Sequence, residues 1–157
     1  LRKVFFQYGE LRNADAMART IVDEREKESI KTTMRLKEVL RRFLPQSKEH
    51  KIIAQVYQAI RIEVNQELTA IEEFLKQSVD LLDVGGRISL ISYHSLEDRL
   101  VKNFIRAGKF EGEAEKDFYG NINVPFKKVG KLIVPSKEEI VKNNRARSAK
   151  LRIAERI

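Results

Sequence analysis

Hydrophobic side chains recur at helical spacing along the first third of the chain. After a break at Gly9, apolar residues follow one another at steps of three or four, which predicts an amphipathic helix. A second helix is predicted to begin near Thr32, whose side chain is suited to cap it, and to end at Pro45. A polar connection is expected over residues 46–51. The apolar positions of the first helix are Leu11, Ala14, Ala18, Ile21 and Val22.

The clearest helical period runs from Ala54 to Leu82. A single helix of this length is about 40 Å long and could join two subdomains. Gly85 and Gly86 are expected to supply the left-handed residue that stops it. The apolar positions of this segment are Val56, Ile60, Val64, Leu68, Ile71, Leu75, Val79 and Leu82.

The period changes after the two glycines. Residues 87–93 form a short, mostly apolar run of strand formers, which is typical of a buried parallel strand. Ser95 is predicted to cap a following helix, with Asp98 as the acid of a near capping box. A helix, a Gly-Gly turn, a buried strand and a helix in succession indicate part of an α/β layered fold.

The last third of the chain alternates between loops and short elements. Residues 108–125 predict a long loop, and residues 126–134 a strand. Ser136 with Glu139 forms a capping-box pattern and predicts a short helix to about residue 142. The alternation over residues 148–157 predicts a final strand with Lys150 and Arg152 on one face.

Composition narrows the class of protein. Hydrophobic residues make up 42% and charged residues 34% of the 157, so a packed core with a solvated surface is expected. Cysteine is absent, which excludes disulfides and agrees with a predicted cytoplasmic location, and the two histidines make a metal site unexpected. The net charge of +8 favours nucleic acid as a partner. The first residue is Leu1 rather than Met, so we expect further sequence upstream.

One candidate site lies at Tyr93, His94 and Ser95, where the predicted strand ends and the next helix begins. Ligands bind beyond the carboxyl ends of strands in open α/β sheets, and a helix N-terminus there offers N–H groups to an anion. The alternative is structural: Ser95 only caps the helix, the following acids offset its dipole, and His94 is an ordinary turn residue.

Two further candidates are basic. Lys150 and Arg152 belong to a C-terminal cluster whose charges suit phosphates, although charges that protect an edge strand explain them equally well. Arg12, Arg19 and Arg25 lie near one helical face beside Tyr8, Phe5 and Phe6, a combination that suits stacked RNA bases. The alternative is that both phenylalanines are core and that the arginines pair with neighbours such as Asp15 or Glu26. The C-terminal cluster comprises Arg145, Arg147, Lys150, Arg152 and Arg156.

Several signatures of catalysis are missing. No Gly-rich loop follows a predicted strand, because Gly85 and Gly86 follow a helix instead. No nucleophile is paired with a base. The sequence of this chain therefore contains no recognisable catalytic centre and no loop that would bind a nucleotide-like cofactor.

Four blocks resemble the family of bacterial ribosomal RNA small-subunit methyltransferases that modify the N4 amine of a cytidine in the decoding region. They cover nearly the whole chain in the family's order, and the last two are the most distinctive. Tyr93 stands where many relatives have Phe, and Asn144 replaces a common Pro. The blocks are Tyr8-Gly9-Glu10 with Arg12 through Val22, Gln58-Ala59-Ile60-Arg61 through Leu68, Gly85-Gly86-Arg87 through His94-Ser95-Leu96-Glu97-Asp98-Arg99, and Asn143 through Arg145-Ala146-Arg147-Ser148-Ala149-Lys150-Leu151-Arg152.

The resemblance implies an α/β fold: the C-terminal part of a Rossmann-like methyltransferase sheet, preceded by an inserted helical subdomain. Residues 1–53 would be the helical RNA-recognition subdomain, and residues 54–157 the methyltransferase part with its connecting helix 54–82. S-adenosylmethionine is the implied methyl donor, and a small-subunit ribosomal RNA cytidine the acceptor. The family's cofactor loop precedes the matched region, so no cofactor-binding residue is assigned to this chain.

The resemblance places the cytidine pocket partly under residues 92–99, with Tyr93, His94 and Ser95 as candidates, and assigns no catalytic residue. Without the preceding strands, the strand at 87–93 lacks a neighbour, so we expect the chain alone to self-associate through an uncovered sheet edge. The alternatives are a non-catalytic RNA-binding module and a DNA-binding helical protein. The DNA-binding alternative does not explain the strand–helix second half of the chain. The predicted RNA contacts are Arg12, Arg19, Arg61, Arg145, Arg147, Lys150 and Arg152.

Overall fold

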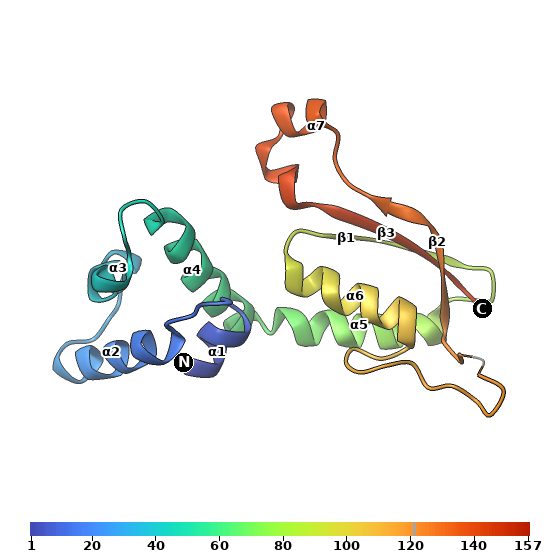
Figure 1. Cartoon of the computed structure of the whole chain (residues 1–157), viewed down its shortest axis with the longest axis horizontal. Helices are drawn as coiled ribbons and strands as arrows, with labels where there is room; N and C mark the ends of the chain where they lie inside the picture. The colour runs from blue at the N-terminus through green and yellow to red at the C-terminus, as the bar shows by residue number, and fades with distance from the viewer. Residues whose placement is uncertain (121) are drawn as a thin grey trace. The chain divides into compact units, whose positions relative to one another are not determined.

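The computed structural model describes residues 1–120 and 122–157, which form two compact units. The first unit, Leu1–Glu67, is helical, and the second, Leu68–Ile157, combines helices with a sheet (Figure 1). The chain is therefore mixed α/β, as predicted. Within the described ranges, no helix is both long enough and apolar enough to cross a membrane.

Amphipathic helices build the first unit around one core. Phe5 and Met17 are fully buried there, against Leu40 and Val56. Thr32 caps α3 as predicted, because its hydroxyl oxygen accepts a hydrogen bond from the backbone N–H of Arg35 at 3.1 Å. The helices are α1 (Arg2–Gln7), α2 (Ala14–Lys27), α3 (Thr33–Val39), a 3₁₀ turn (Arg41–Phe43) and α4 (Glu49–Asn65).

The prediction of one helix over residues 54–82 is wrong at both its start and its middle. Helix α4 already begins at Glu49, so half of the expected polar connection is helical. Gln66 then adopts a left-handed conformation (φ 53°, ψ 38°), which ends α4 and separates it from α5 (Glu67–Leu81). The spacing of apolar residues continues through this break, so the sequence pattern gives no sign of it. Val64, which was assigned to the apolar face of the predicted helix, is exposed. The two compact units also divide here, between Glu67 and Leu68, and the assignment of residues 1–53 to RNA recognition and of 54–157 to the methyltransferase part stays a prediction.

Three antiparallel strands and two helices form the core of the second unit. The strand order is β1-β3-β2, with β3 in the middle, and α5 and α6 cover one face of the sheet (Figure 1). Phe104 of α6 stacks on Phe110 and lies beside Phe126 of β2 in this core. The elements are β1 (Arg87–Ser92), α6 (Ser95–Ala107), β2 (Phe126–Ile133), α7 (Lys137–Lys142), a 3₁₀ turn (Asn144–Ser148) and β3 (Lys150–Arg156).

The strand expected to be buried and parallel, β1, is an edge strand that pairs antiparallel with β3. Its side chains alternate: Ile88 is buried in the core, whereas Ile91 on the opposite face is exposed. In the part of the chain that the structure describes, no strand pairs with the other edge of β1. An apolar run thus predicted the strand correctly, but not its partners, because the partner strand lies more than fifty residues away.

The remaining elements follow the predicted pattern with one correction. Ser136 accepts a hydrogen bond from the N–H of Glu139 at 3.1 Å and caps α7, and Gly85 supplies the left-handed residue (φ 87°) before β1. Residues 108–120 and 122–125 lie in the expected loop region, with an isolated bridge between Lys116 and Ile122. The correction concerns the final strand: β3 is central, so its charges do not protect an edge.

Candidate nucleic-acid interface

His94, and not Ser95, caps α6. The Nδ1 atom of His94 accepts a hydrogen bond from the N–H of Glu97 at 3.3 Å. The Glu97 carboxylate in turn accepts from the N–H groups of His94 (3.2 Å) and Tyr93 (2.7 Å), which completes a capping box. Ser95 is the first helical residue and is exposed. Serine is the usual capping residue and histidine is not, so the sequence pattern pointed to Ser95 instead.

The capping box decides how the three candidate pocket residues are used. The His94 ring is almost buried, and its Nε2 lies 3.1 Å from Oε1 of Glu97, so both ring nitrogens face the same residue. Burial acts to raise the pKa of Glu97, but the hydrogen bonds from His94 and the backbone outweigh it and hold that pKa below its usual value. Tyr93 and Ser95 are exposed to solvent, so they are the two of the three that a ligand can reach.

We expect His94→Ala to lower the free energy of unfolding by about 1 kcal/mol, because it removes the side-chain acceptor of the cap. His94→Asn should restore most of this loss, since an asparagine oxygen caps equally well. Urea unfolding followed by circular dichroism measures both. Ser95→Ala is the matched control and should have little effect. Equal destabilisation by the alanine and asparagine variants of His94 would contradict the cap.

Asp98 ties α6 to the central strand. Its carboxylate accepts hydrogen bonds from Arg152 (Nε at 2.7 Å, Nη2 at 3.2 Å) and from Lys150 (Nζ at 3.0 Å). Burial acts to raise the pKa of Asp98, but the bonds and charges of Arg152 and Lys150 outweigh it, so that the pKa lies below its usual value. Lys150 and Arg152 share a face of the strand as predicted, yet that face points at α6, where each has a protein partner.

The other basic residues of the C-terminal cluster divide into two kinds. Arg156 is structural, because its guanidinium donates to the backbone carbonyls of Val79 and Pro125, each at 3.1 Å. Arg145 and Arg147 lie on the exposed 3₁₀ turn and form no ion pair with any residue that the structure describes. These two arginines are therefore the members of the cluster best placed to meet phosphates.

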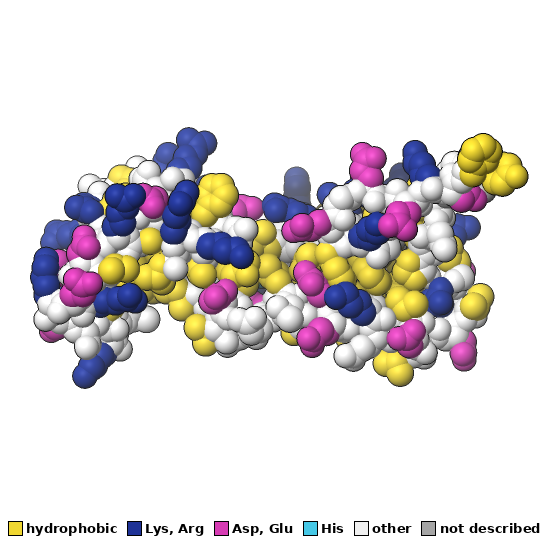
Figure 2. All heavy atoms as spheres, turned by 90° about the horizontal axis from the view of Figure 1, so that it is seen from below, with side chains coloured by type: hydrophobic (Ala, Val, Ile, Leu, Met, Phe, Trp, Pro, Cys, Tyr) yellow, Lys and Arg dark blue, Asp and Glu magenta, His cyan; other side chains and the backbone are white. Residues whose placement is uncertain are grey.

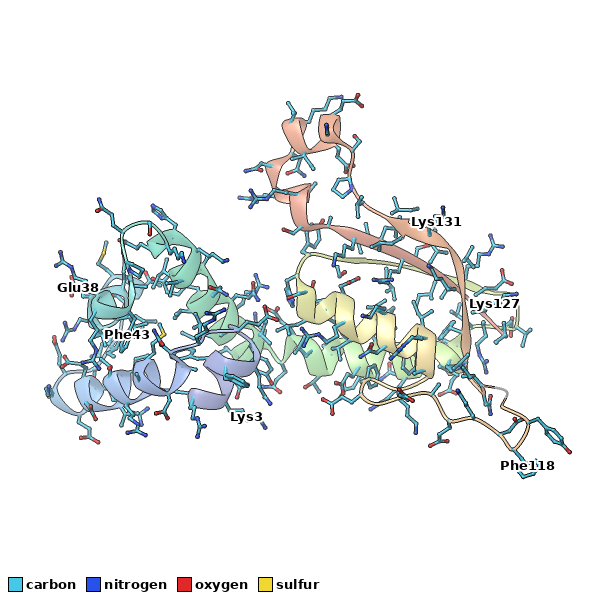
Figure 3. The ribbon with its side chains drawn as sticks, in the orientation of Figure 1. Lys3, Glu38, Phe43, Phe118, Lys127 and Lys131 are labelled. Carbon is cyan, nitrogen blue, oxygen red and sulfur yellow. The ribbon has the colours of Figure 1, made fainter. Side chains whose placement is uncertain are left out.

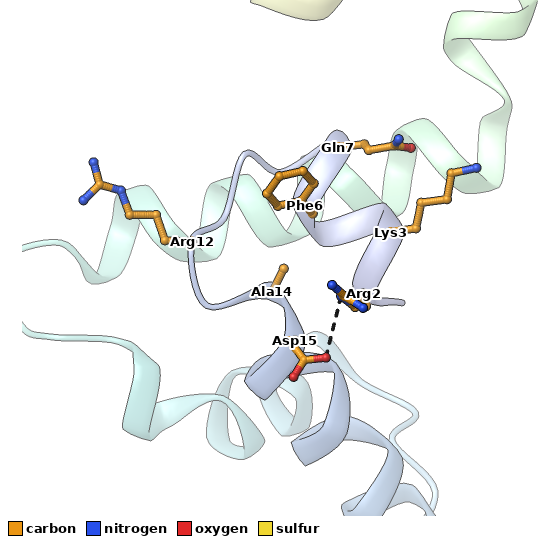
Figure 4. A pocket seen from close by; sticks show the side chains of 7 residues that line it. All are labelled: Arg2, Lys3, Phe6, Gln7, Arg12, Ala14 and Asp15. Carbon is orange, nitrogen blue, oxygen red and sulfur yellow. Dashed lines mark ion pairs between the residues drawn. The ribbon is translucent and has the colours of Figure 1, made fainter.

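The helical unit carries a pocket of about 420 Å³ beside α1 (Figure 4). Phe6 is 66% exposed and lines this pocket, whereas the adjacent Phe5 is completely buried. The alternative that both phenylalanines are core is thus correct for Phe5 and wrong for Phe6. The lining residues are Arg2, Lys3, Phe6, Gln7, Arg12, Ala14 and Asp15.

Charges at this pocket, hereafter the Phe6 pocket, are mostly positive. Asp15 pairs with Arg2 (3.7 Å) and with Arg19 (3.0 Å), as expected for a helix arginine with an acidic neighbour. Lys3 and Arg12 form no ion pair with any residue in the described ranges. Figure 2 shows lysine and arginine side chains over much of the visible face of the helical unit. An exposed aromatic ring beside unneutralised cations suits a stacked base and its phosphates.

Arg61, another predicted RNA contact, is engaged inside the protein. Its Nε lies 2.7 Å from Oε1 of Glu67, and its Nη2 donates to Oε2 at 3.1 Å. This bidentate ion pair joins residues on either side of Gln66, where α4 ends. Arg61 therefore has a structural role at this position.

Comparison with known proteins decides the family. The model of the MraW methylase family matches residues 1–157, the whole chain. The chain belongs to the MraW methylase family. The resemblance seen in the four sequence blocks is thereby confirmed.

The curated relatives of this MraW-family chain share one name, ribosomal RNA small subunit methyltransferase H. Relatives from Flavobacterium johnsoniae and Christiangramia forsetii are 66% and 62% identical over 157 residues, which is 100% of this chain and 52% of each relative. A relative from Flavobacterium psychrophilum is 65% identical over 156 residues, or 99% of this chain and 54% of the relative. The chain thus spans about half the length of the curated relatives it matches.

The described residues of this MraW-family chain do not fit S-adenosylmethionine. A nucleotide-like cofactor needs a strand followed by a Gly-rich turn, so that the backbone can approach it closely. In the described part of the chain, the connections that follow β1 (residues 93–94) and β2 (residues 134–136) contain no glycine. The capping box also occupies N–H groups at the start of α6. We therefore assign no cofactor contact to these residues.

Three residues of the Phe6 pocket, Arg2, Lys3 and Gln7, were not singled out from the sequence. Lys3 and Gln7 stand four apart on α1 and flank Phe6, so that Lys3, Phe6 and Gln7 lie close to one helical face. This spacing was a sequence signal that the three residues share one helical face. The short length of α1 hid it, because a six-residue helix gives too few turns for a clear period.

Proposed function

We propose that this chain is the C-terminal half of an S-adenosylmethionine-dependent methyltransferase that methylates the N4 amine of a cytidine in small-subunit ribosomal RNA. The observation that carries the proposal is the family match over all 157 residues, together with relatives up to 66% identical that are named ribosomal RNA small subunit methyltransferase H. In the proposed whole protein, the second unit is one side of a Rossmann-like sheet. The free edge of β1 is where the remaining strands would join it.

The cofactor would be held by residues outside this chain, since the described residues offer no Gly-rich turn after a strand. The contribution of this chain is then to bind and position the RNA. The Phe6 pocket supports this role with an aromatic ring and unneutralised cations, and Arg145 and Arg147 support it with exposed guanidinium groups. Tyr93 and Ser95, exposed beyond the end of β1, remain the proposed edge of the cytidine pocket.

The test of this function is methyl transfer by the intact protein. With isotope-labelled S-adenosylmethionine and small-subunit ribosomal RNA, we expect the label on N4 of one cytidine, located by nuclease digestion and mass spectrometry. Absence of transfer would refute the enzymatic proposal and favour a non-catalytic RNA-binding module. Calorimetric titration of the chain alone with S-adenosylmethionine should show no binding.

We expect Phe6→Ala to weaken binding of single-stranded RNA by roughly tenfold, because a stacked base would lose its platform. Arg12→Ala should lower the slope of log affinity against log salt by about 0.7, the loss of one phosphate contact. Fluorescence anisotropy with labelled RNA over a salt series measures both effects.

Lys27→Gln is the matched control for the Phe6 pocket, because it also removes one positive charge but Lys27 pairs with Glu24 and does not line the pocket. It should bind RNA nearly as well as the unaltered chain. If Phe6→Ala and Lys27→Gln bind RNA equally well, the pocket is not an RNA site.

Self-association of the chain alone remains a prediction. The exposed edge of β1 carries unpaired backbone groups, and Ile91 beside it is exposed. Gel filtration should show species larger than a monomer. A compact monomer would contradict this expectation.

A further inference from the structure

A second pocket, of about 310 Å³, lies between α6 and the strands β2 and β3 of the second unit. It is separate from the Phe6 pocket and from the start of α6, and none of its residues belongs to the predicted contacts except Arg152. We call it the α6–β2 pocket. Its apolar lining comes from both sides: Ile105 of α6, Val129 and Leu132 of β2, and Ile153 of β3.

A bulge in β2 shapes this pocket. Val129 pairs with Ile153 and Ile133 pairs with Leu151, so three residues of β2 stand opposite the single residue Arg152. Gly130 makes the bulge possible, because it adopts a positive φ of 67° that other residues rarely take. The bulge breaks the strict alternation of the strand, so that Lys131 and Leu132, which are adjacent in sequence, both line the pocket.

Cations surround the apolar lining. Lys102 and Arg106 stand four apart on α6 and therefore on one face of the helix, and Lys128 and Lys131 face them from β2. All four are exposed, and within the described ranges none of them forms an ion pair. Lys131 is labelled on β2 in Figure 3.

Among the residues that the structure describes, no acidic side chain lines this pocket. Arg152 also lines it, but it pairs with Asp98, a carboxylate that it shares with Lys150. The other four cations are therefore unneutralised around a partly enclosed apolar surface, an arrangement that attracts and holds anions. Four cations carry more positive charge than is needed to neutralise a single small anion.

The chemistry of the pocket combines these two features. The aliphatic lining can bury the apolar face of an unpaired base, and the flanking cations attract the phosphates on either side of it. The volume suits one base and not a duplex, since ligand pockets start at roughly 300 Å³. Among the described lining residues, lysine and arginine are the only titratable side chains, which suits binding of an anionic ligand.

We propose that the α6–β2 pocket anchors one unpaired nucleotide of single-stranded RNA, at a position other than the modified base. The base lies on Ile105, Leu132 and Ile153, and the neighbouring phosphates contact the four unpaired cations. The identity of this RNA as the substrate rests on the proposed function, whereas the binding itself does not.

The test measures affinity of the 157-residue chain for a fluorescein-labelled single-stranded RNA by anisotropy. The double variant Lys128→Gln with Lys131→Gln should bind about tenfold more weakly and lower the salt slope by about 1.4, or 0.7 for each phosphate. The matched control, Lys127→Gln with Lys137→Gln, removes the same charge from exposed lysines outside the pocket and should retain most of the affinity. Equal binding by the two double variants would overturn the proposal.

A floor variant separates base binding from charge alone. Leu132→Ser should weaken RNA binding about fivefold, because it removes apolar area that the base would bury, and leave the affinity for inorganic polyphosphate, which has no bases, unchanged. Leu132 is partly exposed, so this substitution is compatible with folding, and circular dichroism verifies it. Unchanged RNA affinity, or an equal loss for RNA and polyphosphate, would refute the base contact and with it the proposal.

Kinetic measurements on the intact protein distinguish the proposed methyltransferase function from the proposed RNA site in the α6–β2 pocket. The Lys128–Lys131 double variant should raise KM for ribosomal RNA and leave kcat unchanged, because the pocket holds no reacting group. If methylation occurs but these variants change neither affinity nor KM, the pocket proposal alone fails. If RNA binding depends on the pocket but no methyl group is transferred, the proposed function alone fails.

Discussion

Asp98→Asn is expected to lower the free energy of unfolding of the second unit by about 3 kcal/mol, because it leaves Lys150 and Arg152 without their counter-charge in a nearly buried setting. The carboxylate joins α6 to the middle strand, so its loss weakens the contact on which the sheet packing depends. Urea unfolding, together with hydrogen exchange of the β1 and β3 amides by mass spectrometry, measures the effect.

The effect of Asp98 should depend on pH in a defined direction. The pKa of Asp98 is lowered in the folded chain, so the stabilisation is fully present above the unfolded pKa of about 3.9. It is lost as the pH falls through the lower folded pKa. The unfolding free energies of Asp98→Asn and the unaltered chain should therefore differ at neutral pH and converge only below about pH 4.

An exposed ion pair in the same sheet is the control for Asp98. Arg87 and Glu155 pair at 2.8 Å across β1 and β3, with side chains 62% and 32% exposed, so this pair is better solvated than Arg152 and Asp98, which are 15% and 10% exposed. Glu155→Gln should therefore cost less than about 1 kcal/mol. If it destabilises the chain as much as Asp98→Asn, burial is not the reason for the larger effect.

Phe126→Ala is expected to destabilise the second unit by about 4 kcal/mol, because it leaves a cavity where a fully buried ring packs. Phe126 is 1% exposed and lies in the core with Phe104 and Ala154. Thermal and urea unfolding should both show the loss.

Phe118 offers a matched control of the same residue type. It is 98% exposed and projects from the loop before β2 (Figure 3). Phe118→Ala should leave the free energy of unfolding within about 0.5 kcal/mol of the unaltered chain. Similar effects of the two substitutions would contradict the position of the core.

Local signals predicted the elements well. Thr32 and Ser136 marked the starts of α3 and α7, and the apolar run at 87–92 marked β1, because a cap or a strand is specified by residues close in sequence. The break at Gln66 was missed, since one left-handed residue leaves the apolar period intact. The pairing of β1 with β3 was also missed, because antiparallel partners far apart in sequence leave no local trace.

Sites proved harder to predict than elements. Lys150 and Arg152 were correctly placed on one face, but only the tertiary structure shows that Asp98 occupies that face. The exposure of Phe6 beside the buried Phe5 depends on how α1 packs. The α6–β2 pocket joins residues from three separate elements, and the bulge at Gly130 that shapes it has no counterpart in the hydrophobic pattern.

The central place of β3 sets an order of events for folding. In the part of the chain that the structure describes, β1 and β2 pair only with β3, so within this chain both depend on residues 150–156 for their ladder hydrogen bonds. During synthesis, the pairing of β1 with β3 must therefore wait until about sixty further residues have left the ribosome. Closing so long a loop is slow, and the nascent chain meanwhile exposes apolar strands that are prone to aggregate.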